Sequence, residues 1–161
     1  HILGIQPFDQ KNVQEAKDAT LRVLEGAGNN GDAQEIGQLL RNVTSSDYLA
    51  LLCWLPRTQE NLEKVQNIKG ALMKRFGVSV SVGFGPRYLH STGQLHKGGP
   101  ENVAFIFIED PNGTDLGIEG ETFSFNDLNK AQVQGDFESL CDRGRSISRV
   151  SLTELQSIVN D

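Results

Sequence analysis

The sequence predicts an α/β domain with a mostly parallel or mixed central sheet of about four to five strands. Helices are expected on both faces of the sheet, and an N-terminal helical segment precedes it. Two observations carry this prediction. Patterns with a helix period alternate with strand-like runs from residue 47 onward. The run YLALLCWL at 48–55 is also apolar throughout, which is typical of a strand buried on both faces in a parallel or mixed sheet.

The first 45 residues predict a helical segment rather than a second domain. Asn12 and Glu15 have the spacing of a capping box, and apolar residues recur on one face of the helix that follows. Asp32 is placed to begin a second, short helix after the flexible stretch AGNNGD. We therefore divide the chain into a helical segment at 1–45 and an α/β domain at 46–161.

Turn and capping residues delimit the elements of the α/β domain. Pro56 ends the first strand, Thr58 can cap the next helix, and Gly77 ends that helix. Ser124 and Asp127 have the spacing of a cap for a long helix, and LTELQSIVN predicts a final helix. The predicted strands are Tyr48–Leu55, Val78–Val82, Val103–Ile108 and Ser146–Leu152.

The composition excludes some classes of function. The 161 residues include 15 basic and 21 acidic side chains, a formal net charge of −6, which argues against general nucleic-acid binding. No apolar run reaches the roughly 18 residues that a membrane helix needs. Cys53 and Cys141 lie in apolar segments without zinc-ligand spacing, so we expect free thiols and a cytoplasmic protein.

One polar loop stands between two predicted strands. The stretch GFGPRYLHSTGQLHKGGP at 83–100 follows the strand VSVSV, at the edge of the sheet where α/β proteins bind ligands. Its centre predicts one or two helical turns with free N–H groups, and His90 is suited to proton transfer near neutral pH. We predict that residues 85–98 of this loop are exposed and bind an anion. Its candidate substrate-binding side chains are Arg87, Ser91, Thr92, Gln94, His96 and Lys97.

The same loop has other interpretations. It could be a structural turn whose histidines satisfy buried backbone groups. Metal binding is disfavoured, because His90 and His96 are six residues apart and the loop contains no carboxylate. The stretch GFGPRY also lacks the third glycine and the helix start of a dinucleotide-binding signature. We therefore expect no metal and no organic cofactor.

A second polar pair lies near the N-terminus, in PFDQKNVQEAK. If the helix begins near Gln10, a spacing of seven residues places Gln10 and Lys17 on one helical face. A lysine and an amide at a helix start can contact a sugar hydroxyl group or transfer a proton. On spacing alone, a solvated lysine on an amphipathic helix is the better interpretation.

This stretch resembles the C-terminal signature of glucose-6-phosphate isomerases, F/Y-D/N-Q-x-G-V-E-x-x-K. Asn12 stands in place of the glycine and Gln14 in place of the glutamate. The resemblance implies that Gln10 and Lys17 lie at an active site, where the lysine contacts the substrate and takes part in opening the sugar ring. The positions that match in register are Phe8, Asp9, Gln10, Val13 and Lys17.

The segment LHSTGQLHKGG resembles the histidine segment of the same family, which implies that His90 is the ring-opening histidine. Here it follows the FDQ motif, whereas in ordinary isomerases it precedes that motif. Together with AQVQGDFESLCDRGR, this order resembles the C-terminal part of bifunctional transaldolase/glucose-6-phosphate isomerases and their single-function relatives. The residues of the later segment that carry the resemblance are Gln132, Gly135, Asp136, Phe137, Leu140, Arg143, Gly144 and Arg145.

The resemblance implies that the chain is the C-terminal part of a longer enzyme that interconverts glucose 6-phosphate and fructose 6-phosphate, and the start at His1 fits this expectation. The family's glutamate base, its enediolate-stabilising arginine and its phosphate loop would lie in upstream sugar isomerase domains, so the chain alone is expected to be inactive. Two alternatives stay open. One is a regulatory module that binds a phosphosugar or another anion, and the other is a structural clamp or homo-oligomer interface.

Overall fold

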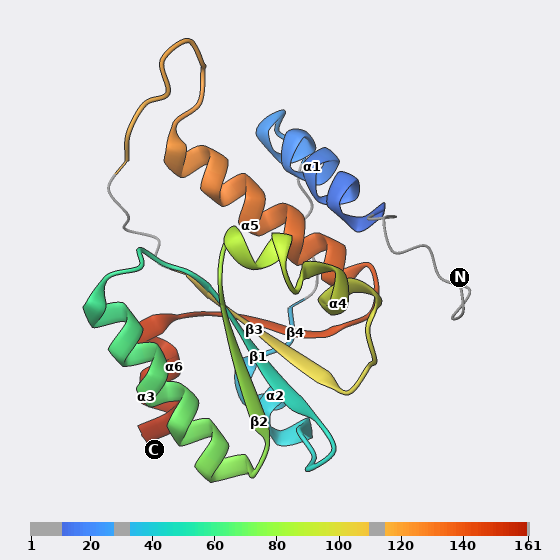
Figure 1. Ribbon diagram of the computed structural model, residues 1–161, viewed down its shortest axis with the longest axis vertical. Coiled ribbons are helices and arrows are strands. Elements are labelled where there is room, and N and C mark those ends of the chain that lie inside the picture. The colour runs from blue at the N-terminus through green and yellow to red at the C-terminus, as the bar shows by residue number, and fades with distance from the viewer. Residues whose placement is uncertain (1–10, 28–32, 110–114, 161) are drawn as a thin grey trace.

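Four parallel strands form a sheet at the centre of the described part of the chain. The computed structural model describes residues 11–27, 33–109 and 115–160, with the backbone alone for residues 11–16 (Figure 1). The strands lie in the order β2-β1-β3-β4, and each neighbouring pair is parallel. They are β1 (Tyr48–Trp54), β2 (Ser79–Phe84), β3 (Val103–Glu109) and β4 (Ser146–Ser151).

Helices cover both faces of this sheet. One face carries α2, α3 and α6, and the other carries α5 and the short helical turns η1 and α4, with α1 beyond them (Figure 1). The α/β class, the parallel sheet and the helical N-terminal segment are therefore as predicted. The helices are α1 (Lys11–Leu24), α2 (Ile36–Asn42), α3 (Gln59–Phe76), η1 (Arg87–His90), α4 (Gly93–Gly98), α5 (Phe125–Cys141) and α6 (Leu152–Asn160).

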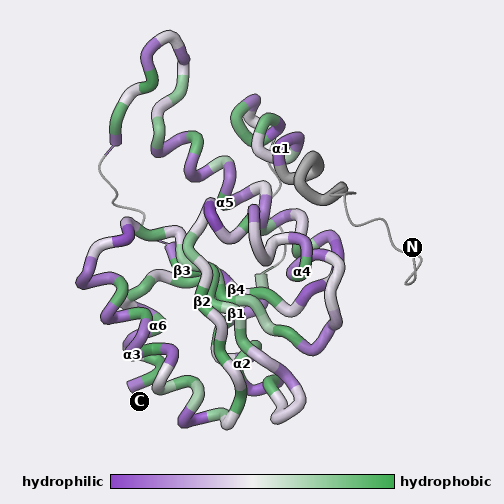
Figure 2. The backbone as a smooth tube through the Cα atoms, viewed as in Figure 1, coloured by the Kyte–Doolittle hydropathy of each residue, from purple (hydrophilic) through white to green (hydrophobic). Residues whose placement is uncertain are grey.

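The two inner strands are buried on both faces. In β1, Leu49, Leu51 and Cys53 pack into the core on the side of α3, whereas Ala50 and Leu52 face α5. The apolar residues of β3 alternate in the same way, and Figure 2 shows the hydrophobic strands running through the middle of the molecule. The unbroken apolar runs in the sequence are therefore explained by burial on both sides.

Local signals in the sequence fix several element ends. The Thr58 hydroxyl oxygen accepts a hydrogen bond from the backbone N–H of Asn61, and α3 ends at Gly77, whose φ of +66° favours glycine. Ser124 and Asp127 form the predicted capping box of α5. The second helix is capped by Glu35, and Asp32, the predicted cap, lies outside the described residues.

α1 lies outside the two helical layers and packs against α5 and α4 (Figure 1). A Cβ atom on Gly135 of α5 would lie 3.1 Å from the Ala19 Cβ and 3.1 Å from the Thr20 nitrogen of α1. Only a glycine allows the two helices to approach so closely at this point. The helical segment is therefore packed directly onto the α/β domain.

Two further expectations concern chemistry and membranes. Cys53 and Cys141 are free thiols, as predicted. No helix in the described residues is both long enough and apolar enough to cross a membrane.

Candidate functional site

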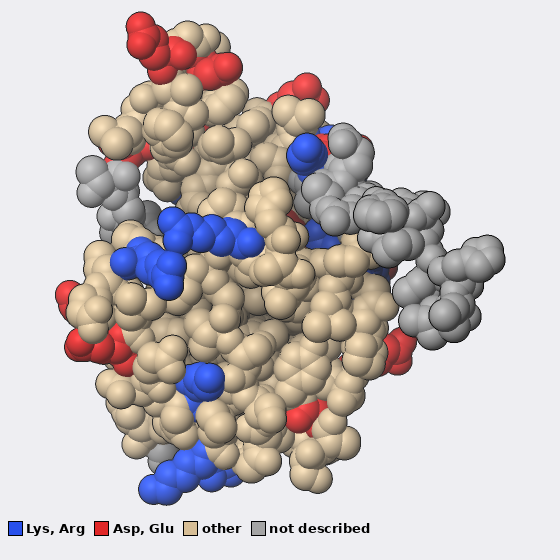
Figure 3. Space-filling model, viewed as in Figure 1, with Lys and Arg blue, Asp and Glu red and all other residues tan. Residues whose placement is uncertain are grey.

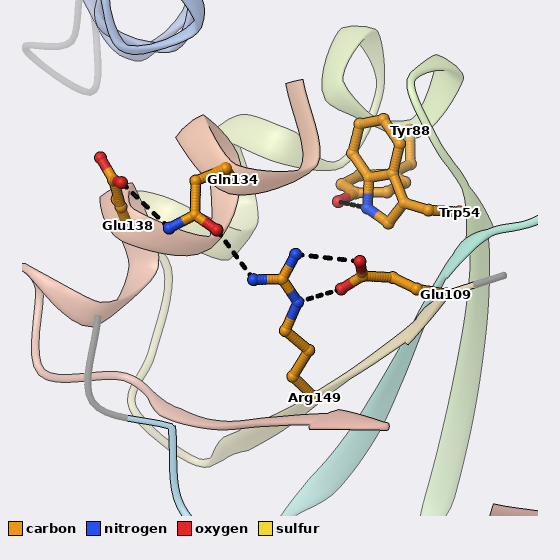
Figure 4. Close-up of polar contacts among 6 residues, drawn as sticks. All are labelled: Trp54, Tyr88, Glu109, Gln134, Glu138 and Arg149. Carbon is orange, nitrogen blue, oxygen red and sulfur yellow. Dashed lines mark hydrogen bonds and ion pairs between the residues drawn. The ribbon is translucent and has the colours of Figure 1, made fainter. Parts of the chain in front are cut away.

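The polar loop at 83–100 folds into η1 and α4, which confirms the predicted helical turns. Tyr88 of η1 is only 3% exposed and lies between two polar partners. Its hydroxyl group donates a hydrogen bond to Asp136 Oδ2 at 2.6 Å and accepts one from Trp54 Nε1 at 3.0 Å (Figure 4 shows the Trp54 contact). Burial, reinforced by the charge of Asp136, raises the pKa of Tyr88 well above its usual value.

Lys97 of α4 forms a buried ion pair with the same carboxylate. Its Nζ atom lies 3.1 Å from Asp136 Oδ1, and the two side chains are 2% and 3% exposed. Asp136 therefore binds η1 through one oxygen and α4 through the other. The prediction of an exposed loop is wrong for Lys97, because this ammonium group faces a carboxylate on α5 instead of solvent.

The prediction of exposure is also wrong for His96. Its ring is 5% exposed and lies between the rings of Tyr88 and Phe105, at centroid distances of 5.6 and 5.2 Å. Its Nδ1 atom has no hydrogen-bond partner among the described residues. Burial lowers the pKa of His96, and the charges of Lys97 and Arg145 add to this effect while Asp136 opposes it.

Arg145 fixes the end of the loop. Its guanidinium group donates hydrogen bonds to the backbone carbonyl oxygens of Lys97 at 3.1 Å, Gly99 at 2.7 Å and Pro100 at 2.9 Å. Asp136 and Arg145 both belong to the later segment that shares the sequence resemblance. The two resembling segments are therefore partners in one buried polar network, which holds the loop against α5.

The remaining predicted side chains of the loop reach solvent. They are exposed on η1, on α4 and between them, on a backbone that the buried network holds in place. Ser91 is additionally bonded to its own turn, since its hydroxyl group donates to the Tyr88 carbonyl oxygen at 3.2 Å. These exposed residues are Arg87, His90, Ser91, Thr92 and Gln94.

The second predicted pair lies on or near α1. Lys17 is exposed on this helix, and Gln10 lies outside the described residues. Because α1 packs against α5 and α4, Lys17 is carried on the same side of the sheet as His90. The two motifs, far apart in sequence, therefore belong to neighbouring elements.

Sequence reasoning missed one basic residue beside the loop. Arg57 is exposed just after the end of β1, and its guanidinium carbon lies 5.8 Å from the centre of the Phe84 ring at the end of β2. Arg87 follows Phe84 by three residues. Figure 3 shows Lys and Arg side chains gathered beside η1 and the start of α3. A basic residue directly after the strand-ending Pro56 was the available signal.

A second polar group, formed by residues of β3, β4 and α5, was also missed. Glu109, the last residue of β3, pairs with Arg149 of β4, and Arg149 Nη1 donates a hydrogen bond to Gln134 Oε1 at 2.8 Å (Figure 4). The sequence offered no spacing that joins these three residues. In the described part of the chain, no cluster of three or more His, Cys, Asp or Glu side chains could hold a metal ion.

Comparison with known proteins finds a similar fold in a solved structure. The crystal structure of hypothetical protein TT0462 from Thermus thermophilus superimposes with a TM-score of 0.61 and 17% sequence identity. The alignment covers 91% of this chain and 41% of that protein, so the chain spans less than half of its length. This likeness shows the fold alone. No protein-family model and no curated protein matches the sequence.

Proposed function

We propose that this chain supplies ring-opening and substrate-contacting side chains to an enzyme that interconverts glucose 6-phosphate and fructose 6-phosphate. The observation that carries the proposal is the packing of α1 against α5 and α4, beside η1. It brings the helix of Lys17 and the turn of His90 to one side of the molecule. The sequence resemblance assigns ring opening to these two residues.

The exposed groups fit the chemistry of a phosphosugar. An imidazole such as that of His90 can move a proton between a sugar hydroxyl group and the ring oxygen, which is what ring opening requires. Arg57 and Arg87 lie near the end of β2 and offer guanidinium groups to a phosphate. The hydroxyl groups of Ser91 and Thr92 add hydrogen bonds.

The buried network supports the same proposal. General acid–base catalysis needs a side chain held within hydrogen-bond reach of its proton. Tyr88 lies two residues before His90 and is bonded to Asp136, so the backbone that carries the imidazole is anchored to α5. The base for the C2 proton is assigned to upstream sugar isomerase domains of a longer polypeptide, so the proposal expects no turnover from this chain alone.

A titration of this chain with glucose 6-phosphate tests the binding part of the proposal. Backbone amide shifts should change at residues 87–94 and on α1 near Lys17. The variants Lys17→Ala and His90→Ala should weaken these changes. Lys74→Ala, which removes an exposed lysine from α3 on the opposite face, is the matched control and should leave them intact. If millimolar glucose 6-phosphate perturbs neither segment, the binding part of the proposal fails.

Activity must be measured in a polypeptide that also carries the sugar isomerase domains. There, His90→Ala should lower kcat by about 10²–10⁴-fold, the usual contribution of general acid–base catalysis. The loss should be smaller when the substrate is supplied with its ring already open. Binding without any loss of kcat in His90→Ala would favour the regulatory module instead. Turnover by residues 1–161 alone would contradict the division of the site between domains.

A further inference from the structure

A hollow of about 750 Å³ opens at the carboxyl ends of the strands, and its lining includes none of the exposed loop residues. Trp54 at the end of β1 and Glu109 at the end of β3 contribute to its base, together with Arg149 of β4. The first half of α5 forms one wall, and the last turn of α1, near Val23, contributes another. Pockets of roughly 300–1,000 Å³ are the usual size for small-molecule sites.

The order of the strands indicates that this position is a place where a ligand could bind. The chain passes from β1 to β2 at one side and then returns across β1 to β3, so the direction of the connections reverses between β1 and β3. Trp54 and Glu109 are direct neighbours in the pairing of these two strands. The hollow therefore lies at the topological switch point, where open α/β sheets bind their ligands.

The polar groups of the hollow are already held in fixed orientations. Two guanidinium nitrogens of Arg149 contact the two carboxylate oxygens of Glu109, and the Nη2–Oε2 distance is 2.9 Å. The third nitrogen donates to Gln134, whose Nε2 atom donates to Glu138 Oε1 at 3.0 Å (Figure 4). The side chains of Arg149 and Glu109 are still 35% and 25% exposed, so a ligand can reach their free edges.

The charges around the hollow cancel. Arg149 and Lys130 are positive, and Glu109 and Asp127 are negative. The partly exposed Glu109 carboxylate can accept hydrogen bonds from hydroxyl groups of a ligand, and the partly exposed Arg149 guanidinium group can donate hydrogen bonds to them. Trp54 is 3% exposed and offers no open ring face for a flat aromatic ligand. Hydrogen bonding to an uncharged ligand with many hydroxyl groups therefore fits this site better than phosphate binding or base stacking does.

We propose that this hollow is a second binding site, with neither Lys17 nor His90 in its lining, and that it takes a neutral sugar of one or two rings. The Arg149–Glu109 pair contacts the hydroxyl groups, and the half-buried apolar side chains of Val23 and Phe123 contact the ring carbons. The site does not depend on the proposed isomerase activity, because it shares none of the residues assigned to that activity.

The single tryptophan of the chain gives a direct measurement, because Trp54 lines the hollow. Glucose and maltose are titrated into the chain while tryptophan emission and backbone amide shifts are followed. Amides at residues 109, 122–134 and 149 should move, with dissociation constants in the millimolar range. The variants Gln134→Leu, which removes the acceptor that orients Arg149, and Asn129→Phe, which fills space, should each weaken binding by about tenfold. Gln66→Leu on the exposed side of α3 should bind as the wild type does.

Three results would overturn this proposal. The first would be that neither sugar perturbs the hollow at tens of millimolar concentration. The second would be that both sugars bind Asn129→Phe as tightly as they bind the wild type. The third would be that inorganic sulfate changes the same backbone amide shifts as strongly as glucose does. Glucose 6-phosphate that perturbs residues 87–94 without reaching the hollow supports the separation of the two sites. Failure of neutral sugars to bind leaves the isomerase proposal untouched, and failure of glucose 6-phosphate at residues 87–94 leaves this one untouched.

Discussion

Asp136 connects three side chains from elements far apart in the sequence. Its carboxylate contacts Tyr88 at 2.6 Å and Lys97 at 3.1 Å, and Tyr88 in turn accepts a hydrogen bond from Trp54. The carboxylate and the ammonium group are both almost completely buried. Removing one partner of a buried pair leaves the other charge without compensation, which costs more than the pair contributes when it is intact.

Asp136→Asn should therefore lower the free energy of unfolding by about 3–5 kcal/mol, measured by chemical denaturation. Asp142→Asn, at an exposed carboxylate just after α5, is the matched control and should change stability by less than about 0.5 kcal/mol. Adding Lys97→Met to Asp136→Asn should recover part of the loss, because no unpaired charge then stays buried. A loss in Asp136→Asn that is no larger than in the control would contradict this account.

His96 makes stability depend on pH through the same network. Burial lowers the pKa of its folded form, so below about pH 6.5 the unfolded chain binds a proton that the folded chain does not. The free energy of unfolding should therefore fall as the pH drops through the unfolded pKa. Lys97 and Arg145 oppose protonation of the folded ring, whereas Asp136 favours it.

Unfolding measured at about pH 7.5 and about pH 5.5 isolates this contribution. Wild type should lose up to about 1.4 kcal/mol more than His96→Phe between the two pH values, since only the wild-type ring can take up the proton on unfolding. Phenylalanine is chosen because it keeps a ring between Tyr88 and Phe105. Equal losses in the two proteins would show that His96 titrates alike in both states.

At the scale of elements, the contact between α1 and α5 decides where the N-terminal motif lies. Gly135 is the point of closest approach, with Ala19 and Thr20 directly opposite. Gly135→Val should displace α1 and lower stability by about 1–3 kcal/mol, as overpacking usually does. Hydrogen exchange of the α1 amides should rise in this variant, because the helix loses its support.

Gly70→Val provides the control for the element-scale experiment. Gly70 also lies inside a long helix, but a Cβ atom there meets no other heavy atom within 4 Å. Valine has a higher helix propensity than glycine, so Gly70→Val should leave stability unchanged or slightly raised. If Gly135→Val were tolerated equally well, the close packing of α1 on α5 would be wrong.

At the scale of the whole molecule, Cys53 reports opening of the sheet. Its side chain lies near the carboxyl end of β1 with no exposed surface, and burial raises its pKa to about 12. In a Cys141→Ser background, a thiol reagent should label Cys53 only as fast as the molecule unfolds, because the reagent needs a solvent-exposed thiolate. Cys141, which is half-buried, should react faster in the wild type. Rapid labelling of Cys53 without denaturant would contradict a continuous buried sheet.

The local sequence by itself determined the class of fold and many of its boundaries. Both faces of an apolar run such as 48–55 are shielded from water only in a sheet that helices cover on both sides. Helical periodicity predicted the positions of α3 and α5. Thr58, Gly77 and the Ser124–Asp127 box act through hydrogen bonds and backbone angles within a few residues. Interactions between residues this close in the sequence can be predicted from the local sequence alone, which is why these predictions were confirmed.

Only the tertiary structure decided the strand order, the burial of the loop and the hollow. By residue type alone, Lys97 and His96 look exposed, because a lysine is seldom buried unless it is paired. The pairing partner, Asp136, lies on a different element and nothing near Lys97 in the sequence marks it. The Glu109–Arg149 pair likewise exists only because β3 and β4 are neighbours. Contacts between residues distant in the chain depend on how the elements pack, and local periodicity carries no information about that packing.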